Sequence, residues 1–318
     1  MNRCRLLSAL AVISLAFASS ATVRAQATSA TPAPAPDQMS SRDSSMPAPP
    51  NILMIETDNI KPYNTTPYDK VAADYVSAAR KANLPGSVIA MEAMSGANRA
   101  QYLFAYDSFD DMQQQEDVTM KNATVTAAFA HLDSLEAPYV TEVHNVIWHY
   151  RDDLSNNPAG ADIPHCRFWE TITFHIKPGY DEKFEATAKM YRDAYTKIGV
   201  SISWAVFESE MGATDTYIVI LPMKTLKEED DNLARQKSLM GAFGDEGAHK
   251  LEETARDAYA SVDDTLWEVN PKTSYVTKAM IAANPDFWTP KAAAPMAKDK
   301  TTMPMKPAAK TPPAAPTQ

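Results

Sequence analysis

Apolar positions recur with helical spacing in two separate segments of the chain. In the second segment they are Phe184, Ala188, Tyr191, Tyr195 and Ile198. In the first they are Tyr68, Ala72, Tyr75, Ala79 and Ala82. Steps of three and four residues place each set on one face of a helix. Asn83 and Gly199 follow these stripes and are suited to a left-handed helix end, so both segments are predicted to be helices.

Short β-rich runs precede both predicted helices. Residues 51–59 and 168–176 are rich in strand-forming side chains and stop before Pro62 and Pro178. Proline cannot donate to a β ladder, so it ends a strand in each case. The two stretches Ile60-Lys61-Pro62 and Ile176-Lys177-Pro178 coincide when residue 51 is set against residue 167, a register that runs without a gap through Ala105 against Leu221.

The same register continues the pattern beyond the helices. Each helix is followed by a predicted hairpin, 87–94 with 99–106 and 201–210 with 215–222, then by a helical stretch, 109–135 or 226–259, and a last strand, 140–150 or 261–269. Three glycines at 241–247 predict an interruption of the later helix. The order is βαββαβ, twice. We therefore expect an α+β fold of two tandem ferredoxin-like repeats that pack their sheets as one intramolecular barrel.

The two ends of the chain differ in composition from this central region. Arginines, an apolar run and small residues make 1–27 typical of a secretory signal, and its apolar run is too short for a membrane span. The predicted domains are the signal at 1–27, a Pro/Ala/Ser linker at 28–50, repeats at 51–156 and 167–276 joined by a linker at 157–166, and a largely disordered tail at 277–318. The product is expected to be secreted or periplasmic and not membrane-spanning.

Charge and cysteine content indicate which classes of partner and which cross-links are not expected. The formal net charge of −10 becomes about −13 without the signal, which disfavours nucleic acid. Cys166 would be a lone thiol, so no internal disulfide is expected. His165 and Cys166 lack two further nearby ligands for a metal. Phosphate loops, G-x-S-x-G, H-E-x-x-H and C-x-x-C motifs are absent from the sequence.

The pattern resembles the dimeric α+β barrel superfamily, in particular NIPSNAP-like and antibiotic-biosynthesis-monooxygenase-like proteins. The resemblance covers about 51–276 and rests on the strand ending at His175-Ile-Lys-Pro-Gly179, the helix with Phe184, the hairpin at Gly212 and the strand with Trp267. The resemblance implies a barrel built from two sheets. In this group the sheets usually come from two protomers, and here they would come from the two halves of one chain. Some members of this group are cofactor-independent oxygenases, some bind haem, and many have no known activity. Fold therefore does not decide the chemistry.

Candidate site residues are those that strand alternation would direct into a barrel. Glu92 and Glu208 hold the same position in the two halves, Trp204 shares the face of Glu208, and His144 shares that of Trp148. Glu208, His175 or His144 would be the base of an enzyme. The ligand wall would comprise Trp204, Trp267, Trp148, Glu92 and Phe207. Solvated or ion-paired carboxylates, packed tryptophans and a strand-capping histidine are the structural alternatives at these positions.

The leading functional prediction is a binding module for a small apolar or aromatic ligand in or at the barrel, without a cofactor. The alternatives are a cofactor-independent monooxygenase-like enzyme, a haem-binding protein and a non-catalytic envelope scaffold. The chain is expected to be a monomer with an intramolecular pseudo-dimer, or a homodimer. A barrel cavity without an ionisable group would favour binding over catalysis.

Overall fold

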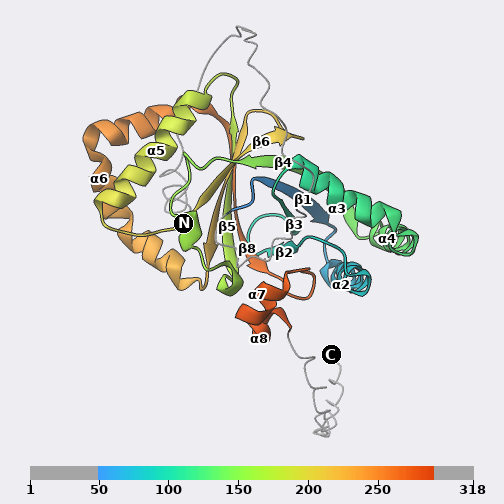
Figure 1. The fold of residues 1–318 in the computed structure, drawn as a ribbon. Helices are drawn as coiled ribbons and strands as arrows, with labels where there is room; N and C mark the ends of the chain where they lie inside the picture. Colours follow the sequence, from blue (N-terminus) through green and yellow to red (C-terminus); the bar gives the residue numbers. More distant parts are fainter. Residues whose placement is uncertain (1–48, 290–318) are drawn as a thin grey trace, which may run out of the picture.

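The computed structural model describes residues 49–289. The predicted signal at 1–27, nearly all of the linker at 28–50 and the tail from residue 290 lie outside the described residues. Within 49–289, no helix combines the length and the apolar character needed to cross a bilayer. Figure 1 shows a central barrel of strands with helices on two opposite flanks.

Both halves of the described chain have the same order of elements. The first comprises β1 (Ile52–Ile60), α2 (Thr65–Ala82), β2 (Val88–Ala93), β3 (Arg99–Tyr106), α3 (Phe109–Lys121), α4 (Ala123–Glu136) and β4 (Val140–Tyr150). The second comprises β5 (Phe168–Ile176), α5 (Asp181–Lys197), β6 (Ala205–Met211), β7 (Thr216–Met223), α6 (Lys227–Ala258) and β8 (Tyr259–Val269). Two short 3₁₀ turns, Pro158–Gly160 and Ile163–His165, connect the halves. The origin of the halves as copies of one unit stays a prediction.

The strands form one closed antiparallel barrel within a single chain. Their order around it is β1-β3-β2-β8-β5-β7-β6-β4. The two halves meet where β2 pairs with β8, with Ala93 opposite Trp267, and where β4 pairs with β6, with Trp148 opposite Ser209. Closure leaves no free sheet edge for another chain to extend. The mixed α and β architecture and the barrel agree with the prediction.

Local sequence signals account for the element boundaries. Asn83 and Gly199 adopt left-handed backbone conformations after α2 and α5, as predicted. Ser108 caps α3 by accepting the Asp111 amide at 3.1 Å, whereas the predicted single helix over 109–135 is divided because the Asn122 side chain caps α4. Gly244, at φ 67°, interrupts α6 where the glycines predicted a break.

Strand pairing corrects two details of the predicted hairpins. The strand predicted to begin at Ser201 begins at Ala205. Glu170 pairs with Leu221, whereas Met54 at the same place in β1 pairs with Phe104, so the ungapped match of Ala105 to Leu221 is wrong by one residue. Between the last paired residues of each hairpin, Glu208 and Tyr217 enclose eight residues whereas Glu92 and Ala100 enclose seven, and Asp215 in the longer segment has φ 49°. One extra turn residue absorbs the offset without moving any side chain to the other face.

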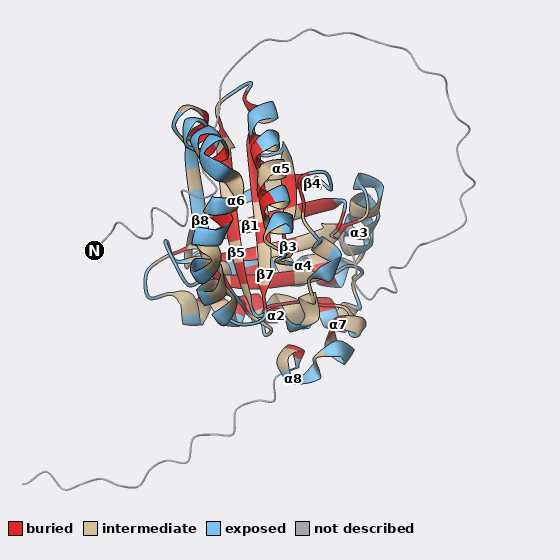
Figure 2. Ribbon diagram, turned by 90° about the vertical axis from the view of Figure 1, so that its left-hand side faces the viewer, coloured by how far each residue is buried: buried red, intermediate tan, exposed pale blue. Residues whose placement is uncertain are grey.

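The interior of the barrel is packed with side chains from all eight strands. Its core cluster takes Leu53 and Ile55 from β1, Ile89 and Met91 from β2, Leu103 from β3, Trp148 from β4, Trp169 from β5, Phe207 from β6, Ile218 and Ile220 from β7, and Trp267 and Val269 from β8. In Figure 2 the buried residues concentrate on these strands. Close packing of these side chains, and no disulfide among the described residues, holds the two halves of the barrel together.

The ordered structure continues past the predicted end of the second repeat. Residues Lys278–Ala283 form α7 and Pro285–Trp288 form α8, beneath the barrel in Figure 1. Met280 and Trp288 are buried against the barrel core, and Trp288 Nε1 donates to the Pro164 carbonyl at 2.9 Å. The predicted tail at 277–318 therefore begins too early, because an aromatic anchor holds its first part on the barrel.

Candidate functional site

The tryptophans proposed as a ligand wall serve mainly as barrel packing. Trp148 and Trp267 are 4% and 1% exposed, and Phe207, 2% exposed, belongs to the same cluster. Trp267 Nε1 donates to Thr171 Oγ1 at 2.8 Å, and the Arg99 guanidinium lies 5.4 Å from the Trp267 ring centre. These three aromatic residues fill the barrel interior and leave no large cavity there.

The two matched glutamates face outward instead of into the barrel. Phe207 and Met91 are in the core, so their strand neighbours Glu208 and Glu92 point to the opposite face. Arg151 donates to Glu208 at 2.6 Å, while Glu92 accepts from Asn270. The idea that their common face lines the barrel is wrong, and both carboxylates have polar partners.

The two candidate histidines point toward one polar end of the barrel. His144 pairs with Thr57 across the strands and contacts Glu142 at 3.1 Å. His175 Nδ1 lies 3.3 Å from Thr216 Oγ1. Glu208 is on the outer face, so the three predicted catalytic residues do not converge on one point. None of them lines any of the three cavities described below.

A small cavity remains at the other end of the barrel. This barrel-end cavity has a volume of about 80 Å³ and is lined by Leu53, Ile89, Leu103, Trp169, Trp204 and Phe207, among others. No ionisable side chain is among its lining residues. Of the predicted ligand wall, Trp204 and Phe207 thus border a real but narrow apolar space.

A much larger cavity lies between the outer face of the first-half sheet and helices α2, α3 and α4. This first-half cavity has a volume of about 600 Å³, within the range of small-molecule sites. Its aromatic wall consists of Tyr75, Tyr102, Phe104, Tyr106, Phe129 and Tyr275. Its acidic wall consists of Glu56, Asp58, Glu116, Asp133 and Glu136. No lysine, arginine or histidine is among its lining residues.

Strand β1 supplies two of these carboxylates. Glu56 and Asp58 alternate with the core residue Ile55, so both project from the helix-covered face. Burial, followed by repulsion from Asp58, raises the pKa of Glu56 to about 7. Asp58 is only 2% exposed; its Oδ2 accepts from Tyr68 at 2.5 Å, and its Oδ1 has no hydrogen-bond partner among the described residues. Burial also raises the pKa of Asp58.

Helix α4 brings two further carboxylates to the same cavity. Burial, with repulsion from Asp58 and Glu56, raises the pKa of Glu136 to about 7. Asp133 accepts a hydrogen bond from the Tyr75 hydroxyl of α2. Four carboxylates from a strand and a helix therefore share one cavity without a compensating cation on its wall. A positively charged ligand would relieve their repulsion and favour their ionised forms.

Sequence reasoning missed this site, although one signal was present. Glu56 and Asp58 interrupt an otherwise apolar face of β1, where the fifth and seventh residues of β5 are Ile172 and Phe174. The contrast between the two halves marks the first as polar. The contribution of Asp133 and Glu136 could not be read from sequence, because it depends on how α4 crosses the sheet.

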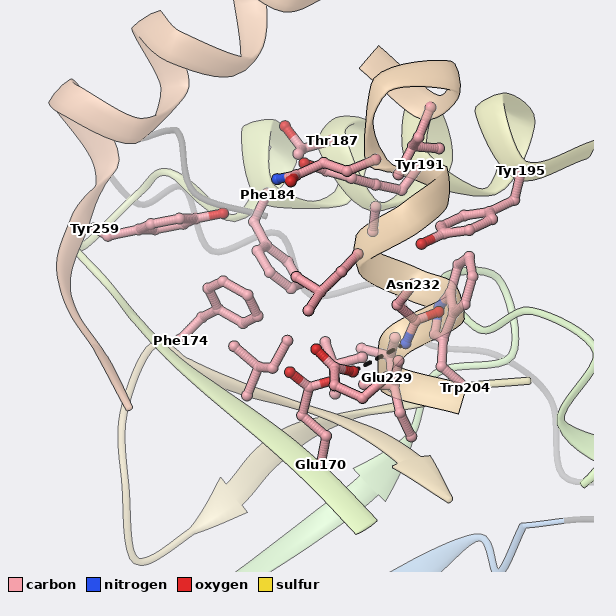
Figure 3. Close-up of a pocket in the computed structure, with 18 residues that line it drawn as sticks. Glu170, Phe174, Phe184, Thr187, Tyr191, Tyr195, Trp204, Glu229, Asn232 and Tyr259 are labelled. Carbon is pink, nitrogen blue, oxygen red and sulfur yellow. Dashed lines mark hydrogen bonds between the residues drawn. The ribbon is translucent and has the colours of Figure 1, made fainter. Parts of the chain in front are cut away.

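The second half has a smaller cavity in the matching layer. This second-half cavity, drawn in Figure 3, has a volume of about 140 Å³ and lies between the outer face of β5, β6 and β7 and helices α5 and α6. Aromatic rings crowd it: Phe174 lies 5.3 Å from Phe184 and 5.1 Å from Tyr259, and Tyr195 lies 5.5 Å from Trp204. Most of the space that is open in the first half is thus filled here.

The described residues also bear on metal and haem binding. Within 49–289, no three His, Cys, Asp or Glu side chains are placed to share a metal ion. A haem pocket with a histidine ligand needs that histidine beside a large cavity. The residues lining the three cavities include no histidine, and His175 and His144 lie at the polar end of a filled barrel. Within the described residues, therefore, none of these three cavities offers a histidine ligand to a haem.

Comparisons with known proteins give only distant likenesses. No family model matches the chain, and no curated protein matches it. Among solved structures, a protein provisionally described as a monooxygenase from Lactobacillus acidophilus is 9% identical, with 71% of this chain and 95% of that chain covered and a TM-score of 0.44. A chlorite dismutase variant from Candidatus Nitrospira defluvii, in complex with cyanide, is 10% identical, with coverages of 70% and 92% and a TM-score of 0.42. At this level of similarity neither structure assigns an activity to this chain.

Proposed function

We propose that the chain is a binding protein for a small organic cation, an amine with an aromatic or apolar body, held in the first-half cavity. The observation that carries this proposal is the combination of five carboxylates and six aromatic rings on the wall of one cavity that has no cationic lining residue. Amines are recognised in proteins by carboxylates together with aromatic faces. Export of the protein is part of the proposal and rests on the pattern of residues 1–27 alone.

The volume and the wall set the size and the orientation of the ligand. About 600 Å³ accommodates a body of one or two rings. Glu56, Asp58 and Glu136 would surround the ammonium group, since repulsion from Asp58 contributes to the raised pKa values of Glu56 and Glu136. Tyr102, Phe104 and Phe129 would contact the apolar body. This retains the small aromatic ligand predicted from sequence but moves it from the barrel to the layer beneath the helices.

Titration calorimetry with three ligands of one shape tests the proposal. We expect the 2-phenylethylammonium ion to bind at least tenfold more tightly than neutral 2-phenylethanol, and phenylacetate not to bind. Glu56→Gln should weaken amine binding about tenfold at pH 8, because it removes a charge-assisted hydrogen bond. The matched control is Glu246→Gln, which removes an exposed carboxylate of α6 paired with Lys250.

A second variant separates loss of the site from loss of the fold. Ala72 of α2 lines the first-half cavity, and Ala72→Leu should narrow it and weaken amine binding. Thermal unfolding of each variant checks that the barrel is intact. Equal affinity for the amine and the alcohol, or amine binding unaffected by both Glu56→Gln and Ala72→Leu, would overturn the proposal.

Amine affinity should also depend on pH. Glu56 and Glu136 have pKa values of about 7 in the ligand-free protein, so about half of each is protonated near neutrality. Since the cation favours the ionised carboxylates, affinity should rise from pH 6 to pH 8, over which the amine stays protonated. In Glu56→Gln this rise should be smaller.

A further inference from the structure

The second-half cavity differs from the first in its charge as well as its volume. Its ionisable lining residues are Glu170, Glu229 and the tyrosines Tyr191, Tyr195 and Tyr259. Burial, followed by repulsion from Asp264, raises the pKa of Glu170 to about 8, and Glu170 and Asp264 are hydrogen-bonded to each other. At neutral pH this pair holds a proton between its two carboxyl groups.

The other carboxylate on the wall is also engaged. Asn232 donates to Glu229 at 3.1 Å, as the dashed line in Figure 3 shows, and Arg235 donates to the Asn232 side-chain oxygen at 2.6 Å. Asn232 thus links Glu229 to the positive charge of Arg235 through two hydrogen bonds. Both carboxylates on this wall therefore have a partner within the protein: Glu170 is paired with Asp264, and Glu229 accepts from Asn232.

One polar group of the second-half cavity has no protein partner. Tyr191 of α5 lines the cavity and is 7% exposed, and its hydroxyl makes no hydrogen bond to any described residue. At the same position of α2, the Tyr75 hydroxyl donates to Asp133. A buried hydroxyl without a partner is unfavourable, and a ligand that pairs with it removes that penalty.

The volume limits the ligand to about one ring. A dry cavity of about 150 Å³ lined by apolar side chains is enough to hold benzene, and the second-half cavity has about 140 Å³. Phe174, Phe184 and Trp204 supply flat aromatic faces on its wall, and Figure 3 shows these side chains among those that line it. Aromatic faces favour a planar ring in offset or edge contact.

We propose that the second-half cavity is a separate site for a small neutral aromatic molecule that carries one hydroxyl group, which pairs with the hydroxyl of Tyr191. An anion is disfavoured by Glu170, Asp264 and Glu229, and a cation has no free carboxylate to meet. The site does not depend on the amine site proposed above, since the two are on opposite flanks of the barrel (Figure 1).

Fluorine NMR of the full-length chain tests this site with 4-fluorophenol and fluorobenzene as probes. Both should bind, the phenol more tightly. Tyr191→Phe keeps the ring and removes the hydroxyl, so it should weaken 4-fluorophenol about fivefold to tenfold and leave fluorobenzene unchanged. Ala188→Leu, which places a larger side chain into the cavity from α5, should abolish binding of both probes.

The matched control is Ala72→Leu, at the same position of α2 in the first half. It should leave 4-fluorophenol binding unchanged while it weakens amine binding, and Ala188→Leu should abolish 4-fluorophenol binding while it leaves the amine unchanged. Thermal unfolding confirms that each variant is folded. Failure of the wild-type chain to bind either probe at millimolar concentration, or an equal effect of Tyr191→Phe on both probes, would overturn the inference. Amine binding that survives such a failure would leave the first-half proposal standing.

Discussion

The layer between sheet and helices has the same order of elements in both halves, but it is open in the first half and mostly filled in the second. In the first half, Glu56 and Asp58 of β1 and Ala79 of α2 border an open cavity of about 600 Å³. In the second, Ile172 and Phe174 hold the corresponding strand positions and Tyr195 the corresponding helix position. Large apolar side chains fill one layer, and small or charged ones leave the other open. The filled layer is built for stability, whereas the open layer has retained buried charge, which is costly unless a ligand compensates it.

The largest expected effect is on the stability of the filled layer. Phe174 is fully buried and contacts Phe184 and Tyr259. Phe174→Ala should lower the free energy of unfolding by about 3–5 kcal/mol, since it removes a large ring and leaves a cavity. Urea denaturation followed by circular dichroism measures it. A loss below about 1 kcal/mol would show that the second layer is not the more tightly packed one.

The open layer should make stability depend on pH. Glu56 and Glu136 have folded pKa values of about 7, raised from 4.5. Protonation therefore favours the folded state: their contribution is fully present below pH 4.5 and is lost as pH rises through 7. The free energy of unfolding of the wild type should fall as the pH rises from 5 to 8. In Glu56→Gln this fall should be smaller by roughly 2 kcal/mol. Parallel urea curves for the two proteins at each pH provide the comparison, and identical pH dependence would contradict it.

The smallest effect distinguishes two tyrosines at one helix position. Tyr75→Phe removes the hydrogen bond to Asp133 and should cost about 1 kcal/mol. Tyr191→Phe removes a hydroxyl that has no partner, so its effect should be near zero or slightly stabilising. Thermal unfolding of the two variants, measured without ligand, ranks them. The reverse order would mean that Tyr191 is the better satisfied group.

Local signals allowed most of the fold to be predicted from the sequence. The apolar stripe ending at Asn83 and Gly199 gave the first helix of each half, and the prolines at 62 and 178 gave the strand ends before them. Glycines at 241–247 marked the break that occurs at Gly244. Such signals act over a few residues, because caps, turns and proline restrict the backbone directly.

The candidate site was predicted poorly for a different physical reason. Strand alternation placed Trp204 and Glu208 on one face, but it does not say which face of a strand enters the barrel. Strands β2, β5, β6 and β7 are buried on both faces and carry apolar side chains on both, so their sequences do not distinguish inside from outside. Glu92 and Glu208 were therefore placed in the barrel when they face outward.

The sequence by itself determined the order of the elements and most of their ends. It also contained the contrast between Glu56 and Asp58 in the first half and apolar residues at the same positions of the second. Only the tertiary structure decided that the barrel interior is filled, that α4 brings Asp133 and Glu136 beside Glu56, and that Trp288 anchors the chain to the barrel end. The physical reason is that local backbone preferences are set by near neighbours in sequence. Cavities and clusters of charge arise where residues far apart in the chain are packed together, and in this barrel the two larger cavities lie on its flanks and not in its interior.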